Sequence, residues 1–277
     1  MPSPHRLGRR AVLYLLVALA MVWTLFPIYW MVTTSLKLPI EYASPEPSWA
    51  PTRITFEHYR SLWEHRFLRY FLNTVITAAA ATVVSLLCGF LAAYALARFR
   101  FPAKLDNLFL LWVLLVKMIP PIVIAIPLYV TLRQLGIINS LLGLVVGYQV
   151  YTLPYCVWML LGFVRDVPLE MEEAAAIDGA SRWRTLWSIV LPLVGPGLAA
   201  TAILSVIMCW NEFTYALLFL RSPAVFTLPI HIASYITEYE VLWGELMGIG
   251  LLASLPILLL SGYVQKYLLR GFAMGFK

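Results

Sequence analysis

Six runs of apolar residues, each long enough to cross a bilayer, limit what this chain of 277 residues can fold into. A helix needs roughly 20 apolar residues to cross about 30 Å of hydrocarbon. Hydrophobic residues make up 61% of the chain and charged residues only 12%, about half the charged fraction of a typical soluble domain. The runs do not alternate with the period of two that membrane β-strands show. The sequence therefore predicts an all-α integral membrane protein with six transmembrane helices.

The apolar runs and the polar stretches between them give the order of the segments. Residues 1–10 form a basic N-terminus, and the run 11–34 lacks a small-residue cleavage site, so we expect it to remain as the first span. A long loop follows at 35–70. A core of five spans with the connections between them occupies 71–269, and 270–277 form the tail. We expect the five spans of this core at 71–97, 105–132, 141–163, 194–220 and 246–268.

The lysine and arginine residues indicate the orientation of the spans. Twelve of them lie on one side, in residues 1–10, 98–104, 165–192 and the C-terminal end of the chain. Seven lie on the other side, five of them in the loop 35–70. Short cytoplasmic loops carry an excess of basic residues. Both termini and the segment 165–192 are therefore expected in the cytoplasm, and the loop 35–70 outside.

The sequence offers little for nucleic-acid binding or catalysis. The net charge is +6, but the basic residues are scattered at the ends of spans. Cys88, Cys156 and Cys209 fall in separate apolar runs without a CxxC spacing, which favours a role as small buried side chains. The phosphate-binding pattern G-x-x-x-x-G-K-[ST] does not occur. We therefore expect no catalytic residue, no metal and no cofactor bound by this chain.

The segment 165–192 is a polar, alanine-rich stretch between two apolar spans. Asp166 can cap a first helix, whose consecutive alanines would let another protein approach the backbone closely. Gly179 suits the left-handed position that ends a helix. Ser181 can cap a second helix, whose apolar face is expected to lie along the membrane interface. We predict that this segment, called the elbow below, is a rigid helical hairpin.

Two other interpretations of the elbow remain open from composition alone. It could be an interfacial loop whose carboxylates are simply solvated. Alternatively, Glu170, Glu173 and Asp178 could hold a metal in a membrane-embedded transferase. Glu170 and Glu173 share a helical face, but no histidine or further aspartate cluster joins them.

The spacing of residues within the elbow is specific. Glu173-Ala174-Ala175 is followed after three residues by Gly179, and after nine more by Ile189-Val190-Leu191-Pro192. This pattern resembles the EAA loop of ABC-importer permeases, where the loop is the coupling helix that fits a cleft on the ATPase subunit. The resemblance extends over essentially the whole chain and narrows to the maltose or carbohydrate type, the MalG-like subunit. Further matching stretches lie at 93–99, 118–121, 210–213, 243–246 and 270–277.

The resemblance implies a permease subunit of an ATP-driven importer for a sugar, oligosaccharide or polyol in a bacterial inner membrane. The implied partners are a MalF-like second permease subunit, two ATP-binding subunits that hold ATP and Mg, and an extracytoplasmic sugar-binding protein. The residues carried over for ATPase coupling are Glu172, Glu173, Ala174, Ala175, Asp178 and Gly179. The outer loop from Arg221 to Glu245 corresponds to the binding-protein contact, with the candidates Thr227, His231, Tyr235 and Glu238.

Several polar residues fall within the predicted spans. Lys117 would lie ~18 Å deep at 1.5 Å per residue, where a bare ammonium group is costly. Asn211 and Glu212 are expected in the outer half of the fifth span, and we hypothesise an ion pair between Lys117 and Glu212. Direct contact with substrate is the alternative, since sugars are bound by planar polar groups and aromatic faces. The candidates for the substrate pathway are Lys117, Tyr148, Gln149, Trp210, Asn211 and Glu212.

Small residues and prolines mark two further places in the spans. Gly89 and Ala93 form a small-xxx-small pair, which is suited to close helix packing. Pro120, Pro121 and Pro127 interrupt the backbone hydrogen bonds of the third span. Such irregular backbone is tolerated at membrane depth against protein or a wet cavity. This span would then line the pathway or a subunit interface, unless the prolines only kink it.

Two other functional classes are kept as alternatives. A self-sufficient secondary transporter or channel for a small polar solute predicts charged relays and inverted repeats, and neither is clear in this sequence. A membrane enzyme predicts metal-dependent chemistry by the isolated chain. Co-purification with an ATPase subunit would separate all three classes.

Overall fold

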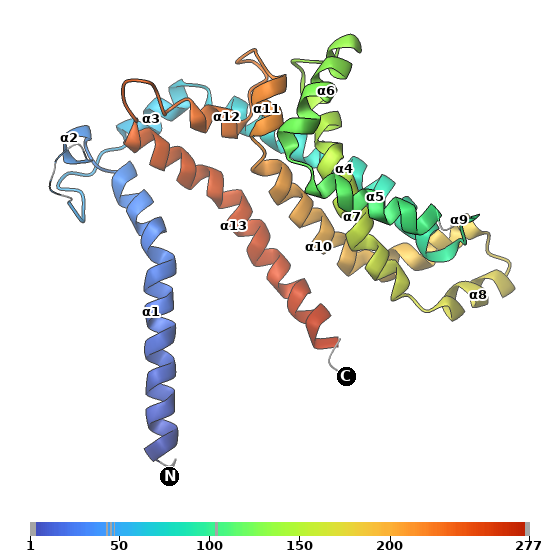
Figure 1. The fold of residues 1–277 in the computed structure, drawn as a ribbon. Coiled ribbons are helices and arrows are strands. Elements are labelled where there is room, and N and C mark those ends of the chain that lie inside the picture. Colours follow the sequence, from blue (N-terminus) through green and yellow to red (C-terminus); the bar gives the residue numbers. More distant parts are fainter. Residues whose placement is uncertain (1–3, 43, 45, 47, 103–104, 275–277) are drawn as a thin grey trace. The chain divides into compact units, whose positions relative to one another are not determined.

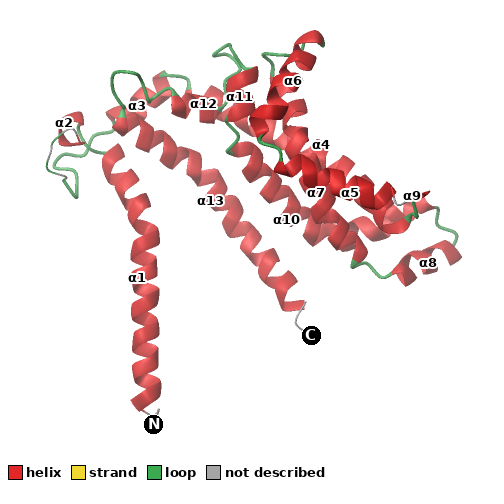
Figure 2. Cartoon of the chain, in the orientation of Figure 1, coloured by secondary structure: helices red, strands yellow, loops and turns green. Residues whose placement is uncertain are grey.

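The computed structural model describes residues 4–42, 44, 46, 48–102 and 105–274. In this part of the chain the only β-structure is an isolated bridge between Ile236 and Val241, and the rest is helix and loop (Figure 1 and Figure 2). The long helices are α1 Pro4–Ser35, α4 Phe67–Arg98, α7 Leu141–Arg165, α10 Leu191–Trp210 and α13 Trp243–Met274. The shorter helices are α2 Pro39–Tyr42, α3 Glu57–Glu64, α5 Leu105–Met118, α6 Pro121–Gln134, α8 Leu169–Ile177, α9 Arg182–Thr185, α11 Thr214–Phe219 and α12 Leu228–Ala233.

Five helical segments in the described residues are long and apolar enough to cross a membrane, and the bent pair of α5 and α6 makes a sixth if it counts as one span. The predicted all-helical membrane architecture is therefore confirmed. The first span, Val12–Ser35, agrees with the predicted 11–34. The last helix is longer than predicted at both ends, and the expected tail is in part its continuation. Residues 275–277 of that tail lie outside the described residues.

The third predicted span, 105–132, is two helices and not one. α5 and α6 have 14 residues each and meet at an angle of 101°. Pro120 immediately precedes α6, and Pro121 is its first residue. Because neither proline has a backbone N–H, the hydrogen-bond ladder of α5 cannot continue through them. The predicted interruption is confirmed at Pro120 and Pro121, and it is larger than a simple kink. Pro127 lies inside α6, which continues through it.

The predicted limits of the fifth span, 194–220, are wrong. The helical segment begins at Arg182, passes through a π-helical turn at Leu186–Val190 and ends at Trp210. Asn211 and Glu212 therefore lie beyond the end of the helix and not in the outer half of a span. The carboxylate of Glu212 accepts hydrogen bonds from the backbone N–H groups of Tyr215 at 2.8 Å and Ala216 at 3.2 Å, so that it begins the separate helix α11.

The chain divides into two compact units, residues 1–67 with 232–255, and residues 68–231 with 256–277. In the second unit α7 is the central helix, and it packs against α10, α5 and α11. A Cβ atom added to Gly89 would lie 2.7 Å from the Cβ atom of Cys156, closer than real Cβ contacts come. The predicted close packing at Gly89 is therefore confirmed, with α7 as the neighbouring helix. Cys156 and Cys209 are buried as expected, whereas Cys88 is exposed.

In the first unit, a buried histidine joins α3 to the start of α13. The ring of His58 lies 3.2 Å from the carboxylate of Glu245 and 2.9 Å from the backbone carbonyl of Lys37. Gly244 provides the space, since an added Cβ atom there would lie 2.3 Å from the His58 ring. These contacts order the polar segment that follows α1.

Candidate functional site

The elbow consists of α8, a glycine turn and α9, between the transmembrane helices α7 and α10. α7 ends at Arg165, and Asp166 is the residue that caps its C-terminus. The predicted role of Asp166 as the cap of the next helix is therefore wrong. That position is held by Pro168, whose fixed backbone angle suits the start of a helix.

Gly179 ends α8 in the left-handed conformation, with φ of 82°. Behind it, the backbone N–H of Ala180 donates to the carbonyl of Ala175 at 2.9 Å, and that of Gly179 donates to the carbonyl of Ala176 at 3.1 Å. This pair of bonds is the Schellman arrangement, which satisfies carbonyl groups at a helix end. The predicted role of Gly179 as the terminator is confirmed, and the turn fixes the path of the chain after α8.

The second helix of the elbow begins as predicted but continues differently. The hydroxyl of Ser181 accepts a hydrogen bond from the backbone N–H of Arg184, which is the predicted cap. However, α9 runs through the π-helical turn directly into α10, and it is not a separate interfacial helix. Leu186 and Val190 are buried in the core with side chains of α4 and α7, while Trp183 is exposed. Thus the elbow is rigidly continuous with a span.

A groove lies along the exposed side of α8. Its volume is about 620 Å³, and its lining is made by side chains of α8, the glycine turn and the following helix, namely Glu170, Met171, Ala174, Ala175, Asp178, Ala180, Arg184 and Ile189. Ala174 and Asp178 are exposed, while Ala175 is buried and forms the floor. Small side chains on an exposed helix leave room for a partner backbone, and the flanking carboxylates and Arg184 supply polar contacts.

Glu172 and Glu173 are adjacent and line the same small pocket, but they differ in burial. Glu173 is exposed on α8. Glu172 is only 10% exposed, and it accepts hydrogen bonds from Arg98 at 2.6 Å and from the hydroxyl of Tyr94 at 2.9 Å. Both donors belong to the end of α4. Glu172, predicted as a docking residue, is thus bound within the chain by two partners that the linear motif does not reveal, although an arginine directly after an apolar run was a usable signal.

The candidates for the substrate pathway do not all gather into one site, although the side chains of Tyr148 and Glu212 meet. Tyr148 and Trp210 are almost completely buried, at 1% and 6% exposure, among other core side chains. Gln149 belongs to a polar cluster between α4 and α7. The hydroxyl of Ser85 donates to the side-chain oxygen of Gln149 at 2.7 Å and lies 2.5 Å from the hydroxyl of Thr152.

The hypothesised ion pair between Lys117 and Glu212 is wrong. The ammonium group of Lys117 lies over the ring of Tyr155, 5.0 Å from its centroid. The carboxylate of Glu212 is used to start α11. Lys117 and Asn211 are exposed in the isolated chain. They are the two pathway candidates on an open surface.

The four candidates for the binding-protein contact also separate by burial. Thr227, His231 and Tyr235 are buried, at 1%, 8% and 6% exposure. The His231 ring packs against Tyr70 with 4.3 Å between centroids. Glu238 is exposed. In this chain, Glu238 is thus the candidate with a side chain accessible to another protein.

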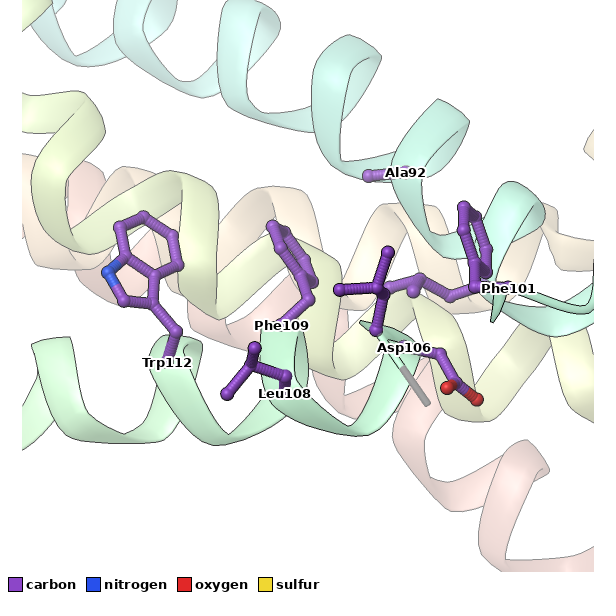
Figure 3. Close-up of a pocket in the computed structure, with 8 residues that line it drawn as sticks. Ala92, Phe101, Asp106, Leu108, Phe109 and Trp112 are labelled. Atoms are coloured by element: carbon purple, nitrogen blue, oxygen red, sulfur yellow. The ribbon is translucent and has the colours of Figure 1, made fainter. Parts of the chain in front are cut away.

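Two further grooves in the second unit have apolar walls. The groove in Figure 3 has a volume of about 650 Å³ between the ends of α4 and α5, and Phe109 and Trp112 point into it (Figure 3). A second groove, of about 590 Å³, extends from Trp112 to Gln149 and Val157. Neither has the array of polar groups that a sugar requires. In the described residues no group of three or more histidine, cysteine, aspartate or glutamate side chains could hold a metal ion.

The chain is similar to known transport proteins over most of its length. The trehalose/maltose transport system permease protein MalG of Thermococcus litoralis is 33% identical over 269 residues, with 96% of each chain covered. The diacetylchitobiose uptake system permease protein DasC of Streptomyces coelicolor is 36% identical over 251 residues, with 90% of each covered. A solved bacterial ABC transporter that imports the acidic polysaccharide alginate is similar in fold, with a TM-score of 0.78 at 20% identity and coverage of 96% of this chain and 99% of that one.

Residues 85–273 match the family described as "Binding-protein-dependent transport system inner membrane component". This range includes the elbow, its glycine turn and most of the spans. The family match covers well over half of the chain, and the helical membrane architecture agrees with it. The chain therefore belongs to the family of binding-protein-dependent transport system inner membrane components and is an inner-membrane permease subunit of an ABC importer, not itself an enzyme.

Proposed function

We propose that this permease subunit forms half of the translocation pathway of an importer for a carbohydrate, and that the groove on α8 is where an ATPase subunit docks. The names of its relatives support a carbohydrate, since they refer to diacetylchitobiose and to trehalose or maltose. A structural relative imports alginate. The shared chemistry of these cargoes is that of sugar chains rich in hydroxyl groups.

The groove on α8 is the observation that carries the proposal. It combines an alanine floor with exposed polar groups at Glu170 and Asp178, and the exposed Glu173 is next to Ala174 of the groove in the chain. The Schellman turn at Gly179 fixes the C-terminal end of α8 beside the groove. A docking surface needs such pre-organisation, because ordering a flexible loop on binding would reduce the affinity.

The proposed assembly contains a second, MalF-like permease subunit, two ATP-binding subunits that hold ATP and Mg, and an extracytoplasmic sugar-binding protein. The basic residues at the span ends support cytoplasmic positions for residues 1–10, for the elbow 165–192 and for the tail 270–277. Residues 35–70 would then face the outside, and Glu238 would be available to the binding protein. Closure of the ATPase subunits would move the two coupling elbows and open the cavity outward.

Co-expression of the chain with its partner subunits tests the proposal. Glu173→Lys reverses the charge on the exposed face of α8, so we expect loss of co-purification with the ATPase subunit and loss of sugar uptake in proteoliposomes. Glu57→Lys is the matched control, because Glu57 is an exposed glutamate in the loop that is expected outside. Uptake that continues without ATP, or an ATPase subunit that remains bound to the Glu173→Lys variant, would contradict the proposal.

A further inference from the structure

Arg98, the last residue of α4, makes contacts that the docking groove does not explain. Its side chain is 13% exposed, although it lies at the end of a span next to polar loops. The Nε atom donates to Glu172 on α8 at 2.6 Å. The Nη2 atom donates to the backbone carbonyls of Val164 at 3.0 Å and Val167 at 2.8 Å. One guanidinium group thus joins the ends of α4 and α7 to the first turn of α8.

The carbonyls that Arg98 binds belong to the last turn of α7 and the chain just after it. The last four carbonyls of a helix have no partner within it, and a cation is stabilised at that end of the helix dipole. The carboxylate of Glu172 lies in the first turn of α8, where the dipole favours a negative charge. Arg98 and Glu172 therefore each complement a helix end and also pair with each other.

The backbone of α8 packs against α9 and the π-helical turn, which follow it in the chain. Side chains of α4 also hold α8, since Arg98 and the hydroxyl of Tyr94 both donate to Glu172, at 2.6 Å and 2.9 Å. α4 is a helix of 32 residues that reaches through the second unit and packs at Gly89 against α7. The bonds of Arg98 and Tyr94 to Glu172 therefore connect a movement of α8 to α4.

We propose that Arg98 is a positioning residue that clamps the coupling elbow to α4 and α7, so that a displacement of α8 moves both helices together. The inference rests on the proposed function, in which the ATPase subunit acts on α8. Arginine is required because its planar fork presents several donors at fixed angles, whereas lysine offers a single ammonium group. Breaking a buried ion pair by removing one partner leaves an uncompensated charge, so the clamp is expected to be sensitive to single substitutions.

The test uses the complete importer in proteoliposomes and measures sugar imported per ATP hydrolysed, together with the KM for ATP. We expect Arg98→Met to lower the import-to-hydrolysis ratio about tenfold, which lies within the usual range of coupling between sites. The KM for ATP should not change, because ATP binds to another subunit. A residue needed only for folding would lower the yield of complex and leave the ratio unchanged in what assembles.

The matched controls remove the same charges nearby without touching the clamp. Arg100→Met and Asp166→Asn affect exposed side chains, and both variants should keep the wild-type ratio. If Arg98→Met does not assemble, Arg98→Lys and Glu172→Gln carry the same test, since each removes part of the clamp. Wild-type ratios in these two variants would overturn the proposal.

The reversed pair Arg98→Glu with Glu172→Arg gives the sharpest result. A simple ion pair would be restored by the exchange. The clamp would not be restored, because a carboxylate at position 98 would face the carbonyls of Val164 and Val167. Recovery of the import ratio in the reversed pair would therefore overturn the three-element clamp. Failure of the wild-type chain to bind any ATPase subunit would instead overturn the proposed function.

Discussion

The glycine turn of the elbow allows a quantitative prediction. Gly179 has φ of 82°, and a Cβ atom added there would have no neighbour within 4 Å. Any effect of a side chain at this position therefore comes from backbone conformation and not from a clash. An L-residue in the left-handed region costs about 1–2 kcal/mol, and the smaller conformational freedom of alanine in the unfolded chain offsets part of this. Gly179→Ala should thus weaken the turn by about 1 kcal/mol.

Hydrogen exchange of the purified complex measures this quantity directly. The amides of Asp178, Gly179 and Ala180 are all hydrogen-bonded within the turn. If they exchange by local opening, a loss of about 1 kcal/mol accelerates exchange about fivefold. Asn at position 179 should have a smaller effect than Ala, because Asn adopts positive φ more readily, and Val should have a larger effect.

Gly162→Ala is the matched control for this series. Gly162 lies within α7, also has no neighbour within 4 Å of an added Cβ atom, and lacks the positive φ. Alanine in a helix interior is favoured over glycine by about 0.5–1 kcal/mol, so exchange in α7 should become slower. The reasoning is refuted if Gly179→Ala leaves exchange in the turn unchanged, or if Asn at 179 is more disruptive than Ala.

Three further predictions concern other parts of the chain. Gly197→Ala places a Cβ atom 2.3 Å from the ring of Phe163 and should destabilise the purified subunit by about 1–3 kcal/mol. Adding Phe163→Leu should recover the thermal stability, and no recovery would contradict this packing. Glu212→Ala removes the acceptor for the first amides of α11 and should cost about 1 kcal/mol, measured as faster amide exchange in α11 but not in α7. A hydrogen bond from the backbone N–H of Thr52 lowers the pKa of Glu41 below its ordinary value of 4.5. The stability that Glu41 gives to the loop 35–70 is therefore present above pH 4.5 and is lost as the pH falls through the lowered pKa. Proteolysis of this loop should accelerate on acidification in the wild type and show no such step in Glu41→Gln.

Local signals in the sequence were sufficient for most of the architecture. Long apolar runs predict membrane spans because a helix satisfies all its backbone hydrogen bonds within the bilayer. Gly179 and Ser181 predict the ends of helices because the backbone conformation of the one and the side-chain hydrogen bond of the other depend only on neighbouring residues. The limits of the fifth span could not be predicted this way. Residues 211–220 are apolar enough to continue a helix, but the Glu212 carboxylate binds the backbone and starts a new one.

Side-chain partners distant in the sequence were the part that could not be predicted. Glu172 and Glu173 are equivalent in a linear motif, and only the fold shows that the first meets Arg98, 74 residues away. Similarly, opposite charge suggested a pair between Lys117 and Glu212, while the fold gives each a different partner. Burial of Tyr148 and Trp210 follows from the packing of helices from several parts of the chain, and periodicity does not report it.

The π-helical turn at Leu186–Val190 explains why the number of residues in the elbow matters for its orientation. The backbone N–H of Leu191 bonds to the carbonyl of Leu186, five residues back, so this turn holds one residue more than an α-helical turn. Each residue of an α-helix advances the direction of the side chains by about 100°. Deleting one residue here would regularise the helix but swing everything before it, α8 included, by about that angle relative to α10. The number of residues between Gly179 and Ile189 therefore determines the direction in which α8 points relative to α10.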